Sequence, residues 1–351
     1  MKKKRIRILI LGLIIIVGVI IWFKFDNITK NESMPKITLT GNKIITINLG
    51  DTYKEEGYQA YDEKDGNITS KVKVTKDTNY DKAGTYQITY KVKNSNGTIA
   101  MAQRFVKVVE KPYYKDSYDK IDNKMRGWWS DNKKDHNRPA GGADINELKK
   151  YGAYFMGPNE KVLYLTFDEG GNETYVKEIV NVLNDNDVKG TFFLCKHYMV
   201  SNQDLVKQMA EAGHSIGNHT ANHYSMPGLA TKENYSKYLA EIQSMEKAYY
   251  EITGKEMDKV YRDPRGEWSY RDLQMVKDLG YRSFFYSADY LDWNGDVTKE
   301  YALNELMKRY HNGAIYLLHP KNKGNYEALD TFIKEMKKLG YRFDLVKNIP
   351  S

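Results

Sequence analysis

Cysteine is almost absent from this chain, which has one, Cys195, among 351 residues. A single cysteine excludes an intramolecular disulfide bond. It also excludes a lipoprotein, because no cysteine directly follows the apolar stretch near the N-terminus. Cys195 comes directly after the apolar run 190–194, which is typical of a strand, and we interpret it as a buried structural thiol.

A concentrated basic surface is lacking as well. The formal net charge is +8, but Lys2, Lys3, Lys4, Arg5 and Arg7 precede the main apolar run and leave about +3 for the rest of the chain. Binding to nucleic acid needs Lys and Arg gathered on one face of a domain. The sequence therefore predicts no nucleic-acid partner.

The apolar run from Ile8 to Phe23 is not followed by the small-x-small pattern at which a signal peptide is cleaved. Basic residues precede the run, and such residues stay on the cytoplasmic side of the membrane. We therefore predict that residues 1–25 form a basic cytoplasmic tip and an uncleaved signal anchor, a single-pass transmembrane helix in the cell membrane. The chain after it would be extracytoplasmic, on the cell-wall side. A cleaved signal peptide is the alternative.

Residues 36–109 alternate apolar and polar side chains, as in the run from Tyr86 to Tyr90. This period of two is typical of strands with one buried face, and turn dipeptides such as Asn96-Gly97 separate the runs. The pattern predicts a small all-β sandwich. The segment also resembles the immunoglobulin-like repeats of bacterial surface proteins. It would serve as a spacer or, alternatively, as a module that binds glycan or protein.

Residues 110–158 show no clear period and are predicted to be a connector, whereas residues 159–351 alternate strand-like and helix-like segments. Repeated strand–helix units build a largely parallel α/β sheet or barrel, and the active sites of such folds lie at the carboxyl ends of the strands. Asp168, Arg262 and His319 each fall at the end of a strand-like run. We therefore expect one site at which they meet.

His219 and His223 lie four residues apart, a spacing at which two imidazoles can bind one metal ion. A Zn²⁺-class ion held in this way leaves positions open for water and substrate. Such an ion polarises a carbonyl group and lowers the pKa of bound water. Asp168 is then the expected general base, and His319 is the expected general acid for a leaving nitrogen.

Two further charged residues can support these four. Asp292 would orient His319, and Arg262 would bind a carboxylate bidentately, either that of Asp168 or that of Asp292. The resulting set suits the hydrolysis of an amide. In that reaction the leaving amine is protonated, and the oxyanion is held by the metal and a backbone N–H.

Five short motifs, in their order along the chain, resemble those of the polysaccharide deacetylases with a NodB-type domain. They are TFDEG at 166–170, HTANH at 219–223 within a longer run, RDPRG at 262–266, DW at 292–293 and LLH at 317–319. The segments RGWW at 126–129 and GAIYLLH at 313–319 look like the branch of peptidoglycan deacetylases that acts on muramic acid in spore cortex and leads to muramic δ-lactam. The resemblance covers roughly residues 113–349 and implies a distorted (β/α) barrel.

The resemblance implies a role for each matching position. The roles are a base (Asp168), an acid (His319), two metal ligands (His219 and His223), two supporting ion-pair residues (Arg262 and Asp292), an oxyanion donor (the backbone N–H of Arg265) and two walls of an acetyl pocket (Trp293 and Leu317). Two positions depart from the family. Most members have a metal-binding Asp where this chain has Glu169, which either binds the metal or points away. Asp263 stands where Pro is common and adds a negative charge beside Arg262.

Together these patterns predict a metal-dependent hydrolase that removes N-acetyl groups from the glycan strands of peptidoglycan, with Zn²⁺ as the metal. The favoured substrate is N-acetylmuramic acid, whose freed amine can close on the lactyl carboxyl to give a δ-lactam. That reaction needs glycan without peptide, which couples the enzyme to an N-acetylmuramoyl-alanine amidase. The alternatives are an N-acetylglucosamine deacetylase acting on peptidoglycan, chitin-like or exopolysaccharide chains, and an inactive wall-binding protein.

Overall fold

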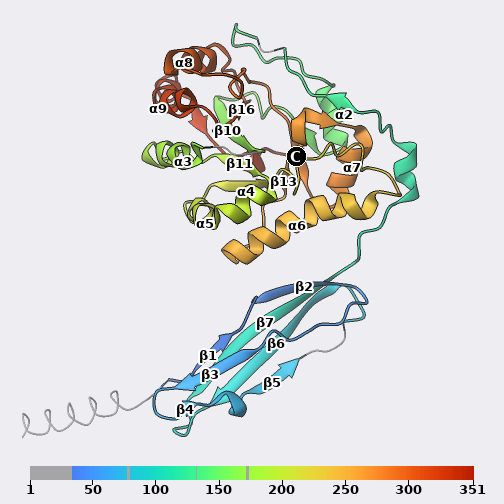
Figure 1. Cartoon of the computed structure of the whole chain (residues 1–351), viewed down its shortest axis with the longest axis vertical. Coiled ribbons are helices and arrows are strands. Elements are labelled where there is room, and N and C mark those ends of the chain that lie inside the picture. Colours follow the sequence, from blue (N-terminus) through green and yellow to red (C-terminus); the bar gives the residue numbers. More distant parts are fainter. Residues whose placement is uncertain (1–33, 77–79, 132, 171–173) are drawn as a thin grey trace, which may run out of the picture. The chain divides into compact units, whose positions relative to one another are not determined.

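A computed structural model describes residues 34–76, 80–131, 133–170 and 174–351. The chain forms two compact units, one ending at Lys111 and the other beginning at Pro112 (Figure 1). The predicted membrane anchor lies outside the described residues. Within the part of the chain that the structure describes, no helix has the length and apolar character needed to cross a membrane.

The first unit is built from two β-sheets. One has the order β1 (Lys36–Leu39), β3 (Tyr58–Asp62), β4 (Gly66–Asn67), and the other has the order β2 (Ile44–Asn48), β7 (Ile99–Val109), β6 (Gly84–Lys93), β5 (Lys73–Lys76). The period of two turns alternate side chains inward, so that Ile88 and Tyr90 of β6 pack with Val106 and Val108 of β7. Leu39 of β1 packs against this cluster. The predicted all-β sandwich is confirmed.

The second unit contains a sheet of parallel strands. Its order is β16 (Ala314–Leu318), β10 (Val162–Glu169), β11 (Thr191–Leu194), β12 (Ser215–Asn218), β13 (Val260–Tyr261), β15 (Arg282–Phe284), β9 (Ala153–Tyr154), with β17 (Arg342–Phe343) beside β10. Among the described residues, the two edges of the sheet are linked by isolated bridges at Met156–Ala314 and Ala288–Tyr316 and not by a continuous ladder. The sheet is therefore an incomplete barrel of parallel strands, which agrees with the predicted α/β architecture.

Helices cover the outside of this sheet (Figure 1). They are α2 (Ile145–Lys150), α3 (Val176–Asp185), α4 (Lys196–Ser201), α5 (Gln203–Glu211), α6 (Tyr235–Thr253), α7 (Tyr270–Asp278), α8 (Lys299–Lys308) and α9 (Lys323–Lys338). Their ends follow local signals. Ser269 caps α7 by accepting a hydrogen bond from the backbone N–H of Asp272, and Gly254 ends α6 in the left-handed conformation with φ of 68°.

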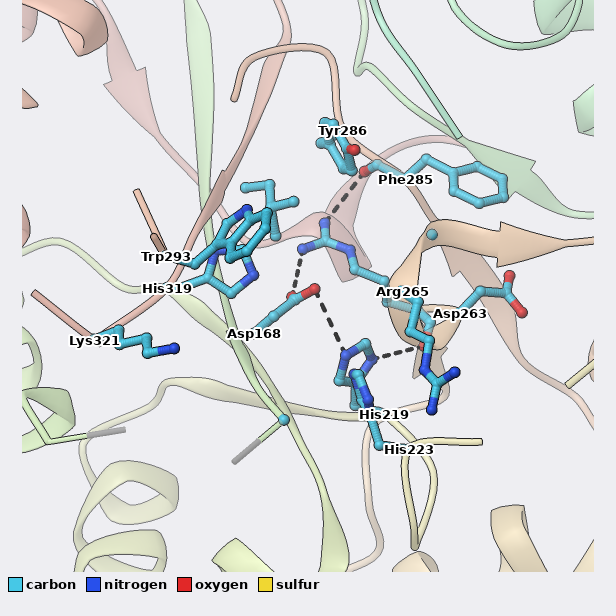
Figure 2. Close-up of a pocket in the computed structure, with 14 residues that line it drawn as sticks. Asp168, His219, His223, Asp263, Arg265, Phe285, Tyr286, Trp293, His319 and Lys321 are labelled. Carbon is cyan, nitrogen blue, oxygen red and sulfur yellow. Dashed lines mark hydrogen bonds and ion pairs between the residues drawn. The ribbon is translucent and has the colours of Figure 1, made fainter. Parts of the chain in front are cut away.

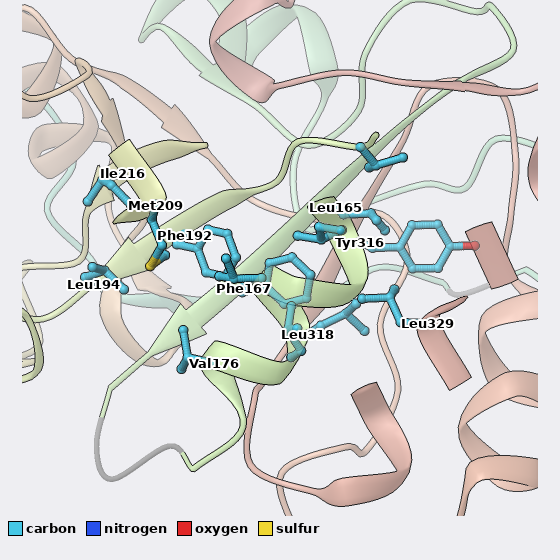
Figure 3. Packing of buried hydrophobic residues seen from close by; sticks show 14 of the residues in the cluster. Leu165, Phe167, Val176, Phe192, Leu194, Met209, Ile216, Tyr316, Leu318 and Leu329 are labelled. Carbon is cyan, nitrogen blue, oxygen red and sulfur yellow. The ribbon is translucent and has the colours of Figure 1, made fainter. Parts of the chain in front are cut away.

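Alternation along β10 decides which of its side chains can reach a site. Leu163, Leu165 and Phe167 join the main hydrophobic core, which they share with side chains from α3, α5 and α9 (Figure 3). Tyr164 belongs to a different cluster. Because successive side chains of a strand point to opposite faces, Asp168 lies on the face of Tyr164, away from the helices.

The segment predicted to be a connector carries short elements of its own. The strand β8 (Arg126–Gly127) pairs with β14 (Glu267–Trp268), and β9 pairs with β15. Trp128 stacks on Phe285 with ring centroids 4.2 Å apart. These residues show no period because their elements are only two to six residues long and pair with strands far along the chain.

Candidate functional site

Most of the predicted residues line one pocket at the carboxyl ends of the parallel strands (Figure 2). Asp168 is the second-to-last residue of strand β10, and His219, Arg262 and His319 directly follow β12, β13 and β16. The pocket is lined by Asp168, Gly170, His219, His223, Arg262, Asp263, Arg265, Gly266, Phe285, Tyr286, Trp293, Leu317, His319 and Lys321. Parallel strands thus bring together motifs from distant parts of the sequence, as the bond from Thr166 to the carbonyl of Tyr316, 150 residues away, illustrates.

Asp168 is buried, and two cationic or polar groups surround its carboxylate. Oδ1 accepts a hydrogen bond from Nη1 of Arg262 at 2.7 Å, and Oδ2 lies 3.8 Å from Nε2 of His219. Burial alone would raise the pKa of Asp168, but the charge of Arg262, helped by His219 and His319, outweighs burial and lowers it. Asp168 is therefore ionised at neutral pH, as a general base must be.

Arg262 is fixed on every side. Nε donates to the carbonyl of Phe284 at 2.7 Å, and Nη1 also donates to Oγ1 of Thr166 at 2.8 Å. Its guanidinium lies 4.3 Å from the centre of the Phe193 ring. A Cβ at Gly217 would lie 2.6 Å from that ring, so the glycine makes room for it. Of the two carboxylates that the sequence left open as partners, Arg262 binds Asp168.

The two histidines after β12 converge through a loop and not along a helix. Residues 219–228 contain no helix, and Thr220 and His223 adopt left-handed φ values of 67° and 57°. Such values are uncommon for residues other than glycine and are held in place by their surroundings. Here the Asn218 side chain accepts from the N–H of Thr220 at 2.9 Å, and the Thr220 hydroxyl accepts from the N–H of His223 at 3.0 Å. The two histidines selected by their four-residue spacing therefore meet through this loop conformation.

Both imidazoles are suited to binding a metal ion. Nδ1 of His219 lies 2.9 Å from the carbonyl oxygen of Arg262 and donates to it, which leaves the Nε2 lone pair facing the pocket. The ring centroids of His219 and His223 are 5.0 Å apart. Burial lowers the pKa of His219, and burial together with His219 lowers the pKa of His223 to about 4. Both rings are therefore neutral at pH 7, the form in which histidine ligates metals.

Glu169 does not line this pocket. It is fully buried and follows Asp168 in β10, so strand alternation directs it to the opposite face. Among the described residues, no group of three or more His, Cys, Asp or Glu side chains is arranged to hold a metal ion. The geometry thus favours the alternative in which Glu169 points away. His219 and His223 fit a divalent ion whose other positions are filled by water or substrate.

His319 is held by Asp292 from two directions. Oδ1 of Asp292 lies 2.7 Å from Nδ1 of His319, and Oδ2 accepts from the backbone N–H of His319 at 2.6 Å. Asn325 then donates to Oδ2 at 3.1 Å and to the carbonyl of His319 at 2.8 Å. With Nδ1 bound to Asp292, Nε2 is the ring nitrogen that can face the pocket. The part of Asn325 in this arrangement is a finding that the sequence did not predict.

The remaining predicted residues lie on the pocket wall. Trp293 is half exposed and lies beside His319 (Figure 2), and the N–H of Leu317 donates to the carbonyl of Ala288 at 2.9 Å. Arg265 adopts a left-handed φ of 61°, and its exposed side chain lies beside His223. The role predicted for its backbone N–H stays a prediction.

Three lining residues were missed by the sequence analysis: Phe285, Tyr286 and Lys321. Phe285 and Tyr286 follow the strand β15, so their position at a carboxyl strand end was a signal that could have found them. Lys321 lies two residues after His319 and is exposed. Its N–H donates to the carbonyl of His319 at 2.8 Å.

Comparisons with known proteins match both units. The polysaccharide deacetylase family matches residues 156–284, and the family of immunoglobulin-like domains of bacterial surface proteins matches residues 37–108. The chain is 37% identical over 233 residues to the peptidoglycan-N-acetylmuramic acid deacetylase PdaA of Bacillus subtilis, covering 65% of this chain and 87% of that protein. It is 32% identical over 201 residues to a peptidoglycan-N-acetylglucosamine deacetylase of Bacillus cereus, covering 56% of this chain and 71% of that protein.

A solved structure agrees with these matches. It is that of Bacillus subtilis PdaA, described as a family 4 carbohydrate esterase, and it superposes with a TM-score of 0.61 at 35% identity. The superposition covers 65% of this chain and 98% of that structure. The resemblance of residues 36–109 to bacterial immunoglobulin-like domains is likewise confirmed.

Proposed function

We propose that this chain, which belongs to the polysaccharide deacetylase family, removes the acetyl group from N-acetylmuramic acid in peptidoglycan. Membership rests on the 37% identity to a relative of which the chain covers 87%. The chain is accordingly a polysaccharide N-deacetylase, a hydrolase, and the predicted enzyme class is confirmed. The alternative of an inactive wall-binding protein is set aside.

The observation that favours muramic acid is the pair of exposed cations on the pocket wall. Arg265 and Lys321 lie on opposite sides of Asp168 (Figure 2). N-acetylmuramic acid differs from N-acetylglucosamine by a lactyl group that carries a carboxylate. A guanidinium binds a carboxylate bidentately, and an ammonium binds it as a point charge. A neutral sugar offers these side chains no such partner. The name of the Bacillus subtilis relative points to the same sugar.

The residues of the pocket account for the hydrolysis of the acetamide. Asp168 accepts a proton from the attacking water, whose oxygen adds to the acetyl carbon. His319, oriented by Asp292, gives a proton to the nitrogen as the carbon–nitrogen bond breaks, which releases acetate and the sugar amine. Members of this family are generally metal-dependent, and an ion on His219 and His223 would polarise the acetyl carbonyl and acidify bound water. The identity of that ion as Zn²⁺ is part of the proposal.

The product has a further consequence if the sugar is muramic acid. The freed amine lies within reach of the lactyl carboxyl of the same sugar, and ring closure with loss of water gives the δ-lactam. Closure needs a free carboxyl, so the peptide must already have been removed by an N-acetylmuramoyl-alanine amidase. A role in making modified wall, such as that of spores, would follow.

We also propose that residues 1–25 anchor the enzyme in the cell membrane, with both units on the wall side and the immunoglobulin-like unit as a spacer. The apolar run and its basic flank support this. Protease added to intact cells should digest both units. Protection of both units until the membrane is permeabilised would contradict the orientation.

The proposed activity is tested on two substrates. The full chain in detergent, with Zn²⁺, is incubated with intact and with peptide-stripped peptidoglycan, and both are digested with a muramidase for mass spectrometry. Loss of acetyl from muramic acid in stripped glycan, with further loss of water, is the expected result. Loss of acetyl from glucosamine alone would overturn the choice of sugar. If the wild type releases no more acetyl than the Asp168→Asn control, the proposed activity is overturned.

A further inference from the structure

A second pair of carboxyl groups lies behind the pocket and takes no part in the chemistry described above. Asp263 directly follows Arg262, and Asp272 lies in the first turn of α7. Their side chains are 1% and 0% exposed. Figure 2 shows the carboxyl group of Asp263 pointing away from Asp168 and His219.

The two groups contact each other and two tyrosines. The Tyr261 hydroxyl donates to Oδ1 of Asp263 at 3.2 Å, and the Tyr238 hydroxyl donates to Oδ1 of Asp272 at 2.6 Å. The two carboxyl groups also lie close enough to interact with each other. Within the described chain, the Oδ2 atom of each is buried and has no hydrogen-bond partner. One proton between the two carboxyl groups would satisfy both of these buried oxygens.

The surroundings oppose two negative charges here. Like charges in contact within a buried site cannot both ionise without a large loss of free energy. The titratable groups that face the pair are Tyr261 on β13, Tyr238 on α6 and Tyr118 beside Tyr238, and none of them is a cation. No ion pair in the described part of the chain includes either aspartate.

The environment also decides which aspartate carries the proton. Asp272 lies in the first turn of α7, where the helix dipole favours a negative charge, and the nearer Tyr238 hydroxyl stabilises it. Asp263 has only the longer bond from Tyr261. Burial and the neighbouring Asp272 raise the pKa of Asp263 well above its usual range.

We propose that Asp263 is a neutral carboxylic acid that donates its proton to Asp272, and that this bond anchors the turn from which Arg265 faces the substrate. Arg265 and Gly266 both have left-handed φ values, 61° and 65°. Such a turn needs contacts that hold it. The N–H of Trp128 holds its far end by donating to the carbonyl of Gly266 at 2.7 Å. The carboxyl pair holds the near end, which makes Asp263 and Asp272 positioning residues.

The proposal has a consequence for pH. When Asp263 loses its proton, two buried carboxylates repel each other and a negative charge appears two residues from Arg265. The turn then loses its anchor, and an anionic substrate meets an added repulsion. The enzyme should lose activity on the alkaline side for this reason. This consequence rests on the proposed function, whereas the shared proton does not.

The shared proton is tested without reference to activity. Infrared difference spectra of the full chain at neutral pH, wild type minus Asp263→Asn, should show the carbonyl band of a protonated carboxylic acid. The Asp272→Asn difference spectrum should show the loss of the same band, because the remaining Asp263 can then ionise and accept from the amide. Absence of an acid band from both difference spectra would overturn the proposal, whether or not the chain proves to be a deacetylase.

The positioning role is tested by kinetics on peptide-stripped glycan. Asp263→Leu removes the anchor and should lower kcat/KM on the order of 10²-fold, the effect of a misplaced substrate-binding group. Asp263→Asn keeps a hydrogen-bond donor to Asp272, so its kcat/KM should be close to that of the wild type. Because an amide does not ionise, this variant should also lack the alkaline decline in activity. Val276→Ala is the matched control, since this buried residue of α7 packs in the same cluster as Tyr238 and Tyr261. It should lower stability and leave the pH profile unchanged. Equal profiles for wild type and Asp263→Asn would refute the role.

Discussion

Replacing Arg262 with Met is expected to lower the stability of the second unit and to raise the pKa of Asp168, the proposed general base. Arg262 is 2% exposed and pairs with Asp168 at 2.7 Å. At an effective dielectric constant of about 20, unit charges about 4 Å apart attract by about 4 kcal/mol. Removing one partner of a buried pair destabilises by about 3–5 kcal/mol, because the other charge stays buried and unpaired. We expect a loss of that size at pH 7.

The loss should depend on pH with a definite sign. In the wild type the pKa of Asp168 is lowered, so its contribution to stability is present above the ordinary value of 3.8 and is lost as the pH falls through the lowered value. Without the charge of Arg262, the main opponent of burial is gone and the pKa of Asp168 rises, so the variant becomes less stable as the pH rises through the raised value. The difference between the two proteins is therefore largest at neutral pH and shrinks in acid.

Denaturant unfolding followed by tryptophan fluorescence is the assay, because Trp128, Trp129, Trp268 and Trp293 all lie in the second unit. The double variant Asp168→Asn, Arg262→Met should be more stable than the sum of the single losses by on the order of 2–3 kcal/mol, because neither charge is left unpaired. Additive losses, or a loss below about 1 kcal/mol in the Arg262→Met variant, would refute the reasoning.

Three further outcomes are expected. His319→Asn should lower kcat by roughly 10²–10⁴-fold with little change in KM, because it removes the proton donor and leaves the pocket wall in place; a rise in KM alone would contradict this role. Arg265→Ala should raise KM for stripped peptidoglycan by roughly tenfold and leave chitin oligomers unaffected, which steady-state kinetics on both substrates will show. Acidification from pH 7 to 4.5 should lower the free energy of unfolding of the metal-free protein. His214, His223 and His311 have pKa values lowered to about 4 by burial, and protonate at about 6.5 when unfolded. Urea titrations at both pH values test it, and a flat dependence would contradict it.

Much of the site was predictable because parallel strands place their carboxyl ends at one rim. That rule alone brings Asp168, Arg262 and His319 together from their sequence positions. Strand alternation could likewise have told the direction of Glu169 from that of Asp168, since the two are neighbours in β10.

Other features depend on tertiary contacts that have no local signal. The loop that carries His223 depends on bonds to Asn218 and Thr220, which hold Thr220 and His223 in left-handed conformations. Asp263 and Asp272 come together only in the folded chain, where side chains of β13 and α7 share one hydrophobic cluster. The sequence predicts that Asp263 adds a negative charge, whereas the structure surrounds it with groups that favour its neutral form.

Arg262 contacts two other site residues, one through its side chain and one through its backbone. Its guanidinium binds Asp168, while its backbone carbonyl accepts the Nδ1 proton of His219. Every amino acid has that carbonyl, so exchanging the side chain disables the base and leaves the imidazole tautomer as it was. Moving the end of β13 would instead disturb both at once. The spacing between the Asp168 carboxylate and the His219 imidazole therefore depends on the position of Arg262, which contacts both groups.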